Sequence, residues 1–383
     1  MASFPSHDTL YRRESNSDHT DVASTVVEET QTPIGPPTHL SFNQDASCFT
    51  ICTDSGFYVF STDPMRRSIS REFGKRRGLG HVAMFFQSNL FVLVGGGSAP
   101  LSPPTKAFLW DDRLNGYVGE LTFRSHIRSL RLLHGCVIVV LLQKIYIYNL
   151  SNFKLSHQVE TVCNPKGLCE VSHAAGPKLM VCPGLQKGQV RVEHYGLRKT
   201  KFINAHNSPI ACLALTSDGR VLATASSKGT LIRVFNSLDG TLLQELRRGA
   251  DQAEIYSLAF SSPAHWLAVS SNKGTVHIFR LKFDSESLLN DGSNNPPVSN
   301  LSKQSAVSSF SMLKGALPKY FSSEWSVARF WLPEGLKHLV AFGKQKNTIF
   351  IIGMDGSFYR CKFDPERGGN MTQLEHHNFL VAS

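Results

Sequence analysis

Short apolar runs recur along the whole chain, each a few residues long and separated by turn-forming residues. The clearest examples are "IACLALTSDGRVLATASSKGTLIRVFNS" from Ile210 and "IYSLAFSSPAHWLAVSSNKGTVHIFRL" from Ile255. In each, an apolar strand is followed by a turn, a second strand, a turn of small residues and an aromatic-containing strand. This alternation of β-branched and aromatic residues, without a helical period, predicts β-strands.

The repeated unit occurs seven times. The units begin at His39, His81, Ile127, Gly167, Ile210, Ile255 and His338. Most are spaced at roughly 40–46 residues, the period of a four-stranded propeller blade. We therefore predict an all-β fold, a closed seven-bladed β-propeller, whose radial repetition protects its sheet edges. A solenoid is the competing architecture. Only Trp110-Asp111 gives the Trp-Asp dipeptide, which indicates a divergent propeller.

Two segments lie outside the repeat. Residues 1–35 are polar and predict a disordered N-terminal arm before a propeller over residues 36–383. The spacing from Ile255 to the last unit is about twice the others, which predicts a long insert in the sixth blade. We place this insert at residues 283–324.

The second half of the insert has an amphipathic pattern. Its apolar residues recur at spacings near three and four: Val307, Phe310, Leu313, Leu317 and Phe321. One apolar face with Lys314 and Lys319 beside it predicts a membrane-inserting helix, which Pro318 kinks or ends. A surface loop folded back on the propeller is the alternative.

The formal net charge is +10. A basic balance favours an anionic partner, whether nucleic acid, anionic membrane or acidic protein, although it also serves simple solubility. The sequence contains no apolar run long enough to span a membrane and no signal core, so we expect a cytoplasmic protein that meets membranes from the surface. The eight cysteines contain no CxxC pair and predict reduced core residues.

No motif predicts catalysis, a cofactor or a metal site, so we expect a protein that is not an enzyme. Gly95-Gly96-Gly97 is followed by "SAPLSPP" rather than by Gly-Lys-Ser/Thr, which indicates a loop between strands rather than a P-loop. Two basic clusters predict solvated loops that add diffuse attraction to anionic lipid. They contain Arg66, Arg67, Lys75, Arg76 and Arg77, and Arg198, Lys199 and Lys201.

Two adjacent arginines, Arg247 and Arg248, stand between the fifth and sixth units. In an extended chain neighbouring side chains point to opposite sides, so this pair would serve two pockets at the seam of two blades. The flanking units offer Ser226, Gly229, Thr230 and Arg233, and Ser271, Gly274, Thr275 and His277. Guanidinium forks and hydroxyl groups suit phosphate oxygens, although ordinary turn construction also explains the serines and glycines.

These residues resemble the PROPPIN family, the phosphoinositide-binding β-propellers of autophagy. The family hallmark Phe-Arg-Arg-Gly stands here as Leu246-Arg247-Arg248-Gly249, and the change to leucine keeps both arginines. The stretches "LVGGGSAPLSPPTKAFLWDD", "KIYIYNL", "NPKGLCEVS" and "LATASSKGTLIRVF" are also similar to the family, and the resemblance covers about residues 38–381.

The resemblance implies two headgroup sites on the propeller rim. The first set is His206, Ser226, Gly229, Thr230, Arg233 and Arg247, and the second set is Arg248, Ser271, Thr275 and His277. The implied ligands are phosphatidylinositol 3-phosphate and phosphatidylinositol 3,5-bisphosphate. We expect both arginines to be exposed at the seam and to contribute little to folding.

The implied role is that of a monomeric scaffold in autophagosome formation. It would be peripheral on preautophagosomal, autophagosomal, and vacuolar or endosomal membranes, with autophagy proteins on the propeller faces. A role in vacuolar or endosomal trafficking, and a protein-binding scaffold without any lipid role, remain alternatives. Nucleic-acid binding is not favoured, because no stripe of interleaved basic and aromatic residues occurs.

Overall fold

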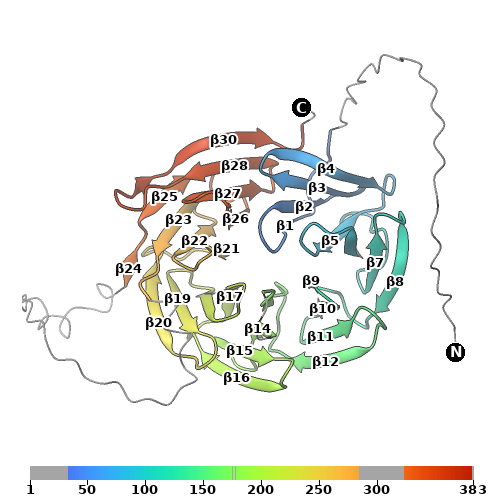
Figure 1. The fold of residues 1–383 in the computed structure, drawn as a ribbon, viewed down its shortest axis with the longest axis horizontal. Helices are drawn as coiled ribbons and strands as arrows, with labels where there is room; N and C mark the ends of the chain where they lie inside the picture. The colour runs from blue at the N-terminus through green and yellow to red at the C-terminus, as the bar shows by residue number, and fades with distance from the viewer. Residues whose placement is uncertain (1–32, 175, 177, 284–322, 382–383) are drawn as a thin grey trace, which may run out of the picture.

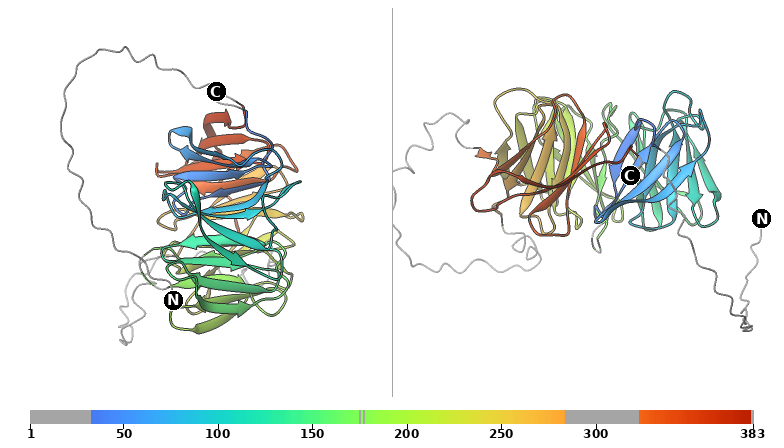
Figure 2. Two further views of the ribbon diagram at one scale, coloured as in Figure 1. Left: turned by 90° about the vertical axis from the view of Figure 1, so that its right-hand side faces the viewer. Right: turned by 90° about the horizontal axis from the view of Figure 1, so that it is seen from above.

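The strands of this protein are arranged as a ring around a central axis (Figure 1). The structure is a computed structural model that describes residues 33–174, 176, 178–283 and 323–381. Within these residues the strands form seven sheets, and every sheet contains a meander of four antiparallel strands. The predicted seven-bladed β-propeller is therefore confirmed. In side view the strands run between the two faces of the ring (Figure 2).

The first four blades follow one another along the chain. The first contains β1 (His39–Phe42), β2 (Cys48–Cys52), β3 (Gly56–Thr62) and β4 (Met65–Glu72). The second contains β5 (Leu79–Met84), β6 (Leu90–Gly95), β7 (Lys106–Asp111) and β8 (Gly116–Thr122). The third contains β9 (Ser129–Leu133), β10 (Cys136–Val140), β11 (Lys144–Asn149) and β12 (Leu155–Glu160). The fourth contains β13 (Glu170–Val171), β14 (Leu179–Pro183), β15 (Gln189–His194) and β16 (Lys199–Asn204).

The last three blades are linked at their outer edges. The fifth contains β17 (Ile210–Leu215), β18 (Val221–Ser226), β19 (Leu231–Asn236) and β20 (Leu242–Arg247), with β24 (Glu324–Trp325) added parallel to β20. The sixth contains β21 (Ile255–Phe260), β22 (Trp266–Ser271), β23 (Thr275–Arg280) and β25 (Ala328–Trp331), with β29 (Gly369–Asn370) added parallel to β25. The seventh contains β26 (His338–Phe342), β27 (Thr348–Gly353), β28 (Ser357–Lys362) and β30 (Thr372–Asn378).

The apolar cores lie between neighbouring blades. Between the fifth and sixth blades, for example, Ile232 and Leu246 pack against Val269 and Phe279, and all four are fully buried. The other face of the fifth sheet turns toward the fourth blade, where Leu222 packs with its apolar residues. Because successive strand residues point to opposite faces, each blade contributes to two cores. This arrangement explains why the middle strands are apolar along their length.

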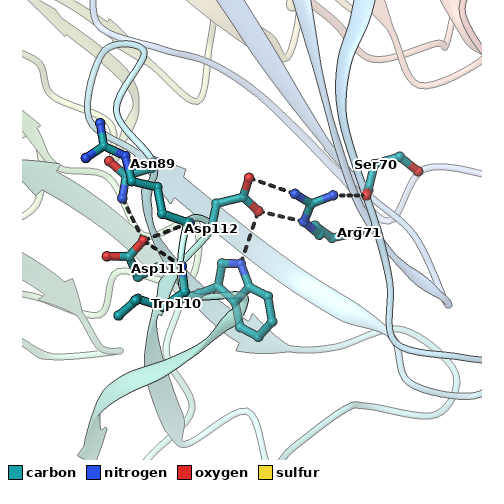
Figure 3. A network of polar contacts seen from close by, with 8 residues as sticks. Ser70, Arg71, Asn89, Trp110, Asp111 and Asp112 are labelled. Carbon is teal, nitrogen blue, oxygen red and sulfur yellow. Dashed lines mark hydrogen bonds and ion pairs between the residues drawn. The ribbon is translucent and has the colours of Figure 1, made fainter. Parts of the chain in front are cut away.

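The only Trp-Asp dipeptide ties the first blade to the second (Figure 3). Trp110 is buried, and its indole N–H donates to Asp112 Oδ1 at 3.3 Å. Asp112 in turn accepts two hydrogen bonds from Arg71 of β4, at 2.6 and 2.9 Å. Asp111 accepts from Asn89 Nδ2 at 2.6 Å and from the backbone N–H of Arg113. Asp112, which directly follows the dipeptide, therefore joins β4 of the first blade to the end of β7 in the second.

The ring closes between the seventh and first blades. The backbone N–H of Ile34 donates to the carbonyl of Leu380 at 3.0 Å, and Ile34 packs with Phe49 and Phe379 in the adjoining core. The ordered propeller therefore begins before residue 36. Within the described residues no helix could cross a membrane.

The long spacing in the sixth unit falls between β23 and β25. Residues 284–322 lie outside the described residues, and so does the predicted membrane-inserting set of Val307, Phe310, Leu313, Leu317 and Phe321. The chain re-enters the described region at Ser323 and pairs first with the fifth blade through β24, before β25 completes the sixth.

Part of one basic cluster is a strand rather than a loop, whereas Lys75, Arg76 and Arg77 lie in a loop after it, as predicted. Arg66 and Arg67 belong to β4, whose residues alternate between exposed and half-buried. Such alternation is typical of an outer strand with one solvent-exposed face. The charge of the cluster alone does not reveal this strand. Lys199 and Lys201 likewise lie in β16. Six cysteines are buried as expected, whereas Cys136 is half-buried and Cys163 is exposed.

Candidate functional site

Two matching turns carry the Ser, Gly and Thr residues singled out from the sequence. The first joins β18 to β19 and the second joins β22 to β23. Gly229 and Gly274 occupy them with φ of +62° and +61°, in the left-handed region that favours glycine. A Cβ on Gly229 would lie 1.8 Å from the carbonyl oxygen of Ala253. Turn construction therefore accounts for both glycines.

Strand register aligns the two blades beyond the turns. Thr224 pairs with Arg233, nine residues later, whereas Val269 pairs with His277, eight residues later. The fifth blade therefore has one extra residue in this stretch. By register, Arg233 of β19 corresponds to His277 of β23, although their distances from the preceding threonine differ.

Arg247 and Arg248 point to different sides of the fifth blade. Arg247, the last residue of β20, lies two residues after Glu245 and on the same face. Its charge contributes to lowering the pKa of Glu245. Arg248 instead lies close enough to His277 of the sixth blade to lower the pKa of that imidazole. The divergence expected of adjacent residues is thus present.

Arg248 is not exposed, contrary to the expectation from the sequence. Only 7% of it is accessible, and Nε donates to the carbonyl of Gly229 at 3.0 Å. Its NH2 group donates to the carbonyl of Asp251. The expected exposure of Arg248 is therefore wrong. Because its buried guanidinium satisfies two backbone carbonyls, we infer that it also contributes to folding.

The first set gathers on the face of the fifth sheet that looks toward the fourth blade. Arg233 donates from Nε to Glu245 Oε2 at 2.9 Å and from NH1 to the carbonyl of Ala205 at 2.6 Å. His206 Nε2 lies 2.9 Å from Thr224 Oγ1. Burial, together with the charge of Arg233, lowers the pKa of His206 to about 4. This imidazole is therefore neutral near pH 7.

Glu245 places a carboxylate within the first set. Burial opposes its ionisation, but hydrogen bonds from Arg233 and Ser323 and the charges of both arginines outweigh burial and lower the pKa of Glu245. The Ser323 hydroxyl donates to Oε1 at 2.9 Å. The positive charge of Arg233 is thus compensated within the protein.

The second set lies between the fifth and sixth blades. His277 Nδ1 lies 3.0 Å from Ser326 Oγ, and Arg329 Nε donates to the same oxygen at 3.1 Å. Burial, followed by the charges of Arg329 and Arg248, lowers the pKa of His277 to about 4. Two guanidinium groups therefore approach one neutral imidazole from two neighbouring blades.

Ser271 and Thr275 flank the turn beside this imidazole, at the ends of β22 and β23. Thr275 Oγ1 donates to the carbonyl of Lys273 at 3.2 Å. Ser271 is buried, and its hydroxyl has no hydrogen-bond partner among the described residues. This hydroxyl therefore has unused hydrogen-bonding capacity, which is uncommon for a buried polar group.

The remaining members of the first set are Ser226, Gly229 and Thr230, and two of them contact Arg248 of the second set. Ser226 is buried at the end of β18, and its carbonyl accepts from the N–H of Gly229 at 2.9 Å. The carbonyls of Gly229 and Thr230 accept from Arg248, through the side chain and the backbone N–H respectively. Gly229 and Thr230 therefore stand between the two sets.

Sequence reasoning missed four residues of the site. Arg329 and Glu245 are the outer-strand partners of His277 and Arg233, and only the strand register reveals them. Lys228 and Lys273 are exposed at the tips of the two turns. A signal for the lysines was present, because "SSKGT" and "SNKGT" repeat the same lysine before the same glycine.

A cavity of about 890 Å³ lies among the fourth, fifth and sixth blades. Its walls include Gly188, Pro209, Ser227 and Ala253. It shares turns with the two sets, but none of the predicted site residues lines it. The candidate site is therefore a pair of clusters on two sides of one blade, separate from this cavity, and every member of the second set is buried.

Comparison with known proteins places this geometry in context. The chain is similar to Autophagy-related protein 18e of Arabidopsis thaliana, at 46% identity over 89% of this chain and 87% of the relative. It is 31% identical to Autophagy-related protein 18 of Dictyostelium discoideum, over 89% of this chain and 93% of that protein. A crystal structure of Hsv2 from Kluyveromyces marxianus has the same fold, with a TM-score of 0.70 and 23% identity over 90% of this chain and 99% of that one.

A complex of KlAtg21 with the coiled-coil of AgAtg16 contains a propeller of the same fold, with a TM-score of 0.70 and 23% identity over 90% of this chain and 100% of that one. The family model described as PROPPIN matches residues 38–380 of this chain. That span contains every residue of the two sets. The protein is therefore a member of the PROPPIN family.

Proposed function

We propose that this protein binds phosphoinositides at the seams on either side of the fifth blade and acts as a scaffold in autophagosome formation. The ligands would be phosphatidylinositol 3-phosphate and phosphatidylinositol 3,5-bisphosphate. Each headgroup carries phosphate oxygens, which guanidinium and hydroxyl donors bind through charge-assisted hydrogen bonds. No catalytic role is proposed for any residue.

The observation that carries the proposal is the composition of the second set. Arg248 and Arg329 bring two positive charges to His277, and their side chains donate hydrogen bonds to neutral oxygens. The buried Ser271 hydroxyl adds a donor without a partner among the described residues. An anionic phosphate would relieve the repulsion between these groups and satisfy the hydroxyl.

Two sites on one molecule would reinforce each other at a membrane. Once one headgroup is bound, the other pocket meets its lipid at a high effective concentration, so modest sites give firm attachment. Sites on the rim would also hold the ring edge-on, and would leave its two faces for autophagy proteins. The names of the relatives support the autophagy role, and the Atg21 complex is an example of a related propeller with a protein partner.

Vesicle flotation tests the proposal. We expect the protein to float with phosphatidylcholine vesicles that contain phosphatidylinositol 3-phosphate and to remain below with unphosphorylated phosphatidylinositol. Arg247→Thr together with Arg248→Thr should abolish this difference. A matched control is Arg66→Thr with Arg67→Thr, an adjacent arginine pair on β4 of the first blade. The control variant should keep the difference between the two kinds of vesicle.

Because Arg248 is buried, its loss also affects folding, and a second variant isolates the binding role. Arg329 is exposed on β25, and its side chain donates to the hydroxyl of Ser326. Arg329→Ser should keep the far-ultraviolet circular dichroism spectrum and melting temperature while weakening headgroup binding. If the unmodified protein floats equally well with and without the phosphoinositide, the proposal is overturned. That result would favour a scaffold that binds only proteins.

The insert contributes a separate element of the proposal. Its residues Val307, Phe310, Leu313, Leu317 and Phe321 lie outside the described residues, and their pattern alone supports membrane insertion. Replacing residues 300–322 by a Gly/Ser linker should weaken flotation while leaving the affinity for soluble headgroup unchanged. Unchanged flotation would contradict an inserting role.

A further inference from the structure

The chain has four tryptophans, and they fall into two groups. Trp110 is buried, and Trp266 is half-buried, with its ring against Phe363 at a centroid distance of 5.0 Å. Trp325 and Trp331 are instead 44% and 63% exposed. Exposed indoles are costly to leave in water, because most of an indole is apolar.

Each exposed tryptophan stands beside one candidate set. Trp325 of β24 is the parallel strand partner of Arg247, which belongs to the first set. Trp331 of β25 is the antiparallel partner of Thr275, which belongs to the second. Paired residues of neighbouring strands point to the same face of their sheet. The two indoles therefore accompany the two sets, one each.

Strand register shows that this placement repeats. Arg247 lies two residues after Glu245 on β20, and Trp331 lies two residues after Arg329 on β25. Glu245 and Arg329 are the partners of Arg233 and His277. Trp331 thus occupies in the sixth blade the position that Arg247 occupies in the fifth.

The charges nearby fit an anionic surface. Lys228 and Lys273 are exposed at the two turn tips. Of the neighbouring acids, Glu324 pairs with Lys282 at 2.9 Å, and Glu245 pairs with Arg233. Glu334 lies beside Gly274 and is exposed. Two of these three carboxylates are thus compensated, and exposed lysines beside exposed indoles favour the boundary between lipid headgroups and acyl chains.

We propose that Trp325 and Trp331 enter this boundary when the protein is membrane-bound and act as two interfacial anchors beside the headgroup pockets. This inference rests on the proposed function, because a headgroup held in a rim pocket brings the adjacent strand to the depth of the lipid interface. An indole there buries its rings toward the acyl chains and keeps its N–H among the polar groups.

Two anchors and two headgroups would define a plane. Because β24 and β25 belong to the edges of neighbouring blades, that plane crosses the rim at the seam of the fifth and sixth blades, on the left in Figure 1. The anchors would therefore fix how far the ring rotates about its own axis at the membrane, which headgroup binding at one pocket leaves free.

The test uses the tryptophans themselves as probes, in the full-length protein. Trp325→Phe leaves Trp331 as the exposed fluorophore, Trp331→Phe leaves Trp325, and the variant with both changes gives the background from the two inner indoles. Each is mixed with phosphatidylinositol 3-phosphate vesicles whose phosphatidylcholine carries bromine on its acyl chains. Bromine quenches only fluorophores that reach the acyl region.

We expect bromine to quench the fluorescence of both single variants. In the variant with both changes, quenching should fall to the background level of the two inner indoles. We also expect Trp325→Ala with Trp331→Ala to weaken flotation by about fivefold or more, through lost apolar burial. Its affinity for the soluble headgroup inositol 1,3-bisphosphate should stay within experimental error. Leu114→Ala is the matched control, since Leu114 is 70% exposed and lies in the second blade, across the ring.

The outcomes separate this inference from the proposed function. Phosphoinositide-dependent flotation without quenching of either indole would overturn the anchors and leave the headgroup sites standing. Flotation that does not depend on phosphoinositide would overturn the proposed function, and the anchors with it. A fall in headgroup affinity equal to the fall in flotation would also overturn the anchors, because the indoles would then belong to the pockets.

Discussion

The two sets on either side of the fifth blade are built on the same repeat but differ in charge. In the first, the outer-strand partner of Arg233 is Glu245, so a guanidinium faces a carboxylate at 2.9 Å. In the second, the corresponding partner of His277 is Arg329, and the arginines donate to neutral oxygens. One outer-strand residue therefore decides whether a seam carries a compensating carboxylate or a further positive charge. The second set should attract phosphate more strongly.

The largest effect should follow from Arg248. Arg248→Ala leaves the carbonyls of Gly229 and Asp251 without their buried donor, and we expect the free energy of unfolding to fall by about 2–3 kcal/mol. Arg247→Ala should cost clearly less, because this residue is only half-buried. Urea unfolding followed by circular dichroism measures both. Equal losses would remove the distinction between a structural and a purely binding arginine.

Acid should destabilise both seams. His206 and His277 have pKa values of about 4 in the folded protein, against about 6.5 when unfolded. The unfolded chain therefore binds more protons between pH 6.5 and pH 4, and stability that is present above pH 6.5 is lost as the pH falls. Each histidine should lower the free energy of unfolding by on the order of 2 kcal/mol between pH 7 and pH 5.

Melting temperatures at pH 7 and pH 5 provide the measurement. The variant with His206→Gln and His277→Gln should lose part of this pH dependence, since glutamine does not titrate. The other buried histidines account for the remainder. An unchanged pH slope in this variant would mean that neither imidazole is held neutral by its seam.

Glu245→Gln should sharpen the electrostatic comparison. Removing the carboxylate frees Arg233 for phosphate, so the first set should bind inositol 1,3-bisphosphate about fivefold more tightly. The glutamine oxygen can still accept from Ser323, which preserves the fold. Calorimetric titration should show two sites whose affinities become more alike. Weaker binding would instead show that Glu245 is needed to position Arg233.

The smallest effects should come from Lys228 and Lys273. Either lysine changed to serine should weaken vesicle binding at low salt by no more than about fivefold, because each contributes up to about 1 kcal/mol near an anionic surface. The difference should vanish in high salt, since exposed charges are screened. Cosedimentation at two salt concentrations measures this. An effect that persists in high salt would mean that the lysine binds the headgroup directly.

Much of this architecture could be predicted from the sequence, because a blade is a local structure. Strands that pair with their immediate neighbours appear as apolar runs at a fixed period, and units predicted at Ile210, Ile255 and His338 begin β17, β21 and β26. The divergence of Arg247 and Arg248 could also be foreseen, since it needs only an extended backbone.

The burial of Arg248 and the presence of Arg329 could not be foreseen in the same way. Arg248 is covered by the loop to the sixth blade, which follows it in sequence but carries no apolar signal. Arg329 lies beside His277 only because β25 pairs with β23. The two strands are far apart in the sequence, and Ser326, which contacts His277, follows it by 49 residues. Register across a long insert is not encoded in local spacing.

The two short parallel pairs at the rim have a consequence for strand addition by partners. β24 occupies the outer edge of the fifth blade at Leu246 and Arg247, and β29 occupies that of the sixth at Ala328 and Arg329. An extended peptide seeking free backbone N–H and C=O groups would find these edges partly taken. Partners that bind by extending a sheet would thus be directed to the outer strands β4, β8, β12, β16 and β30, and away from the outer edges of the fifth and sixth blades.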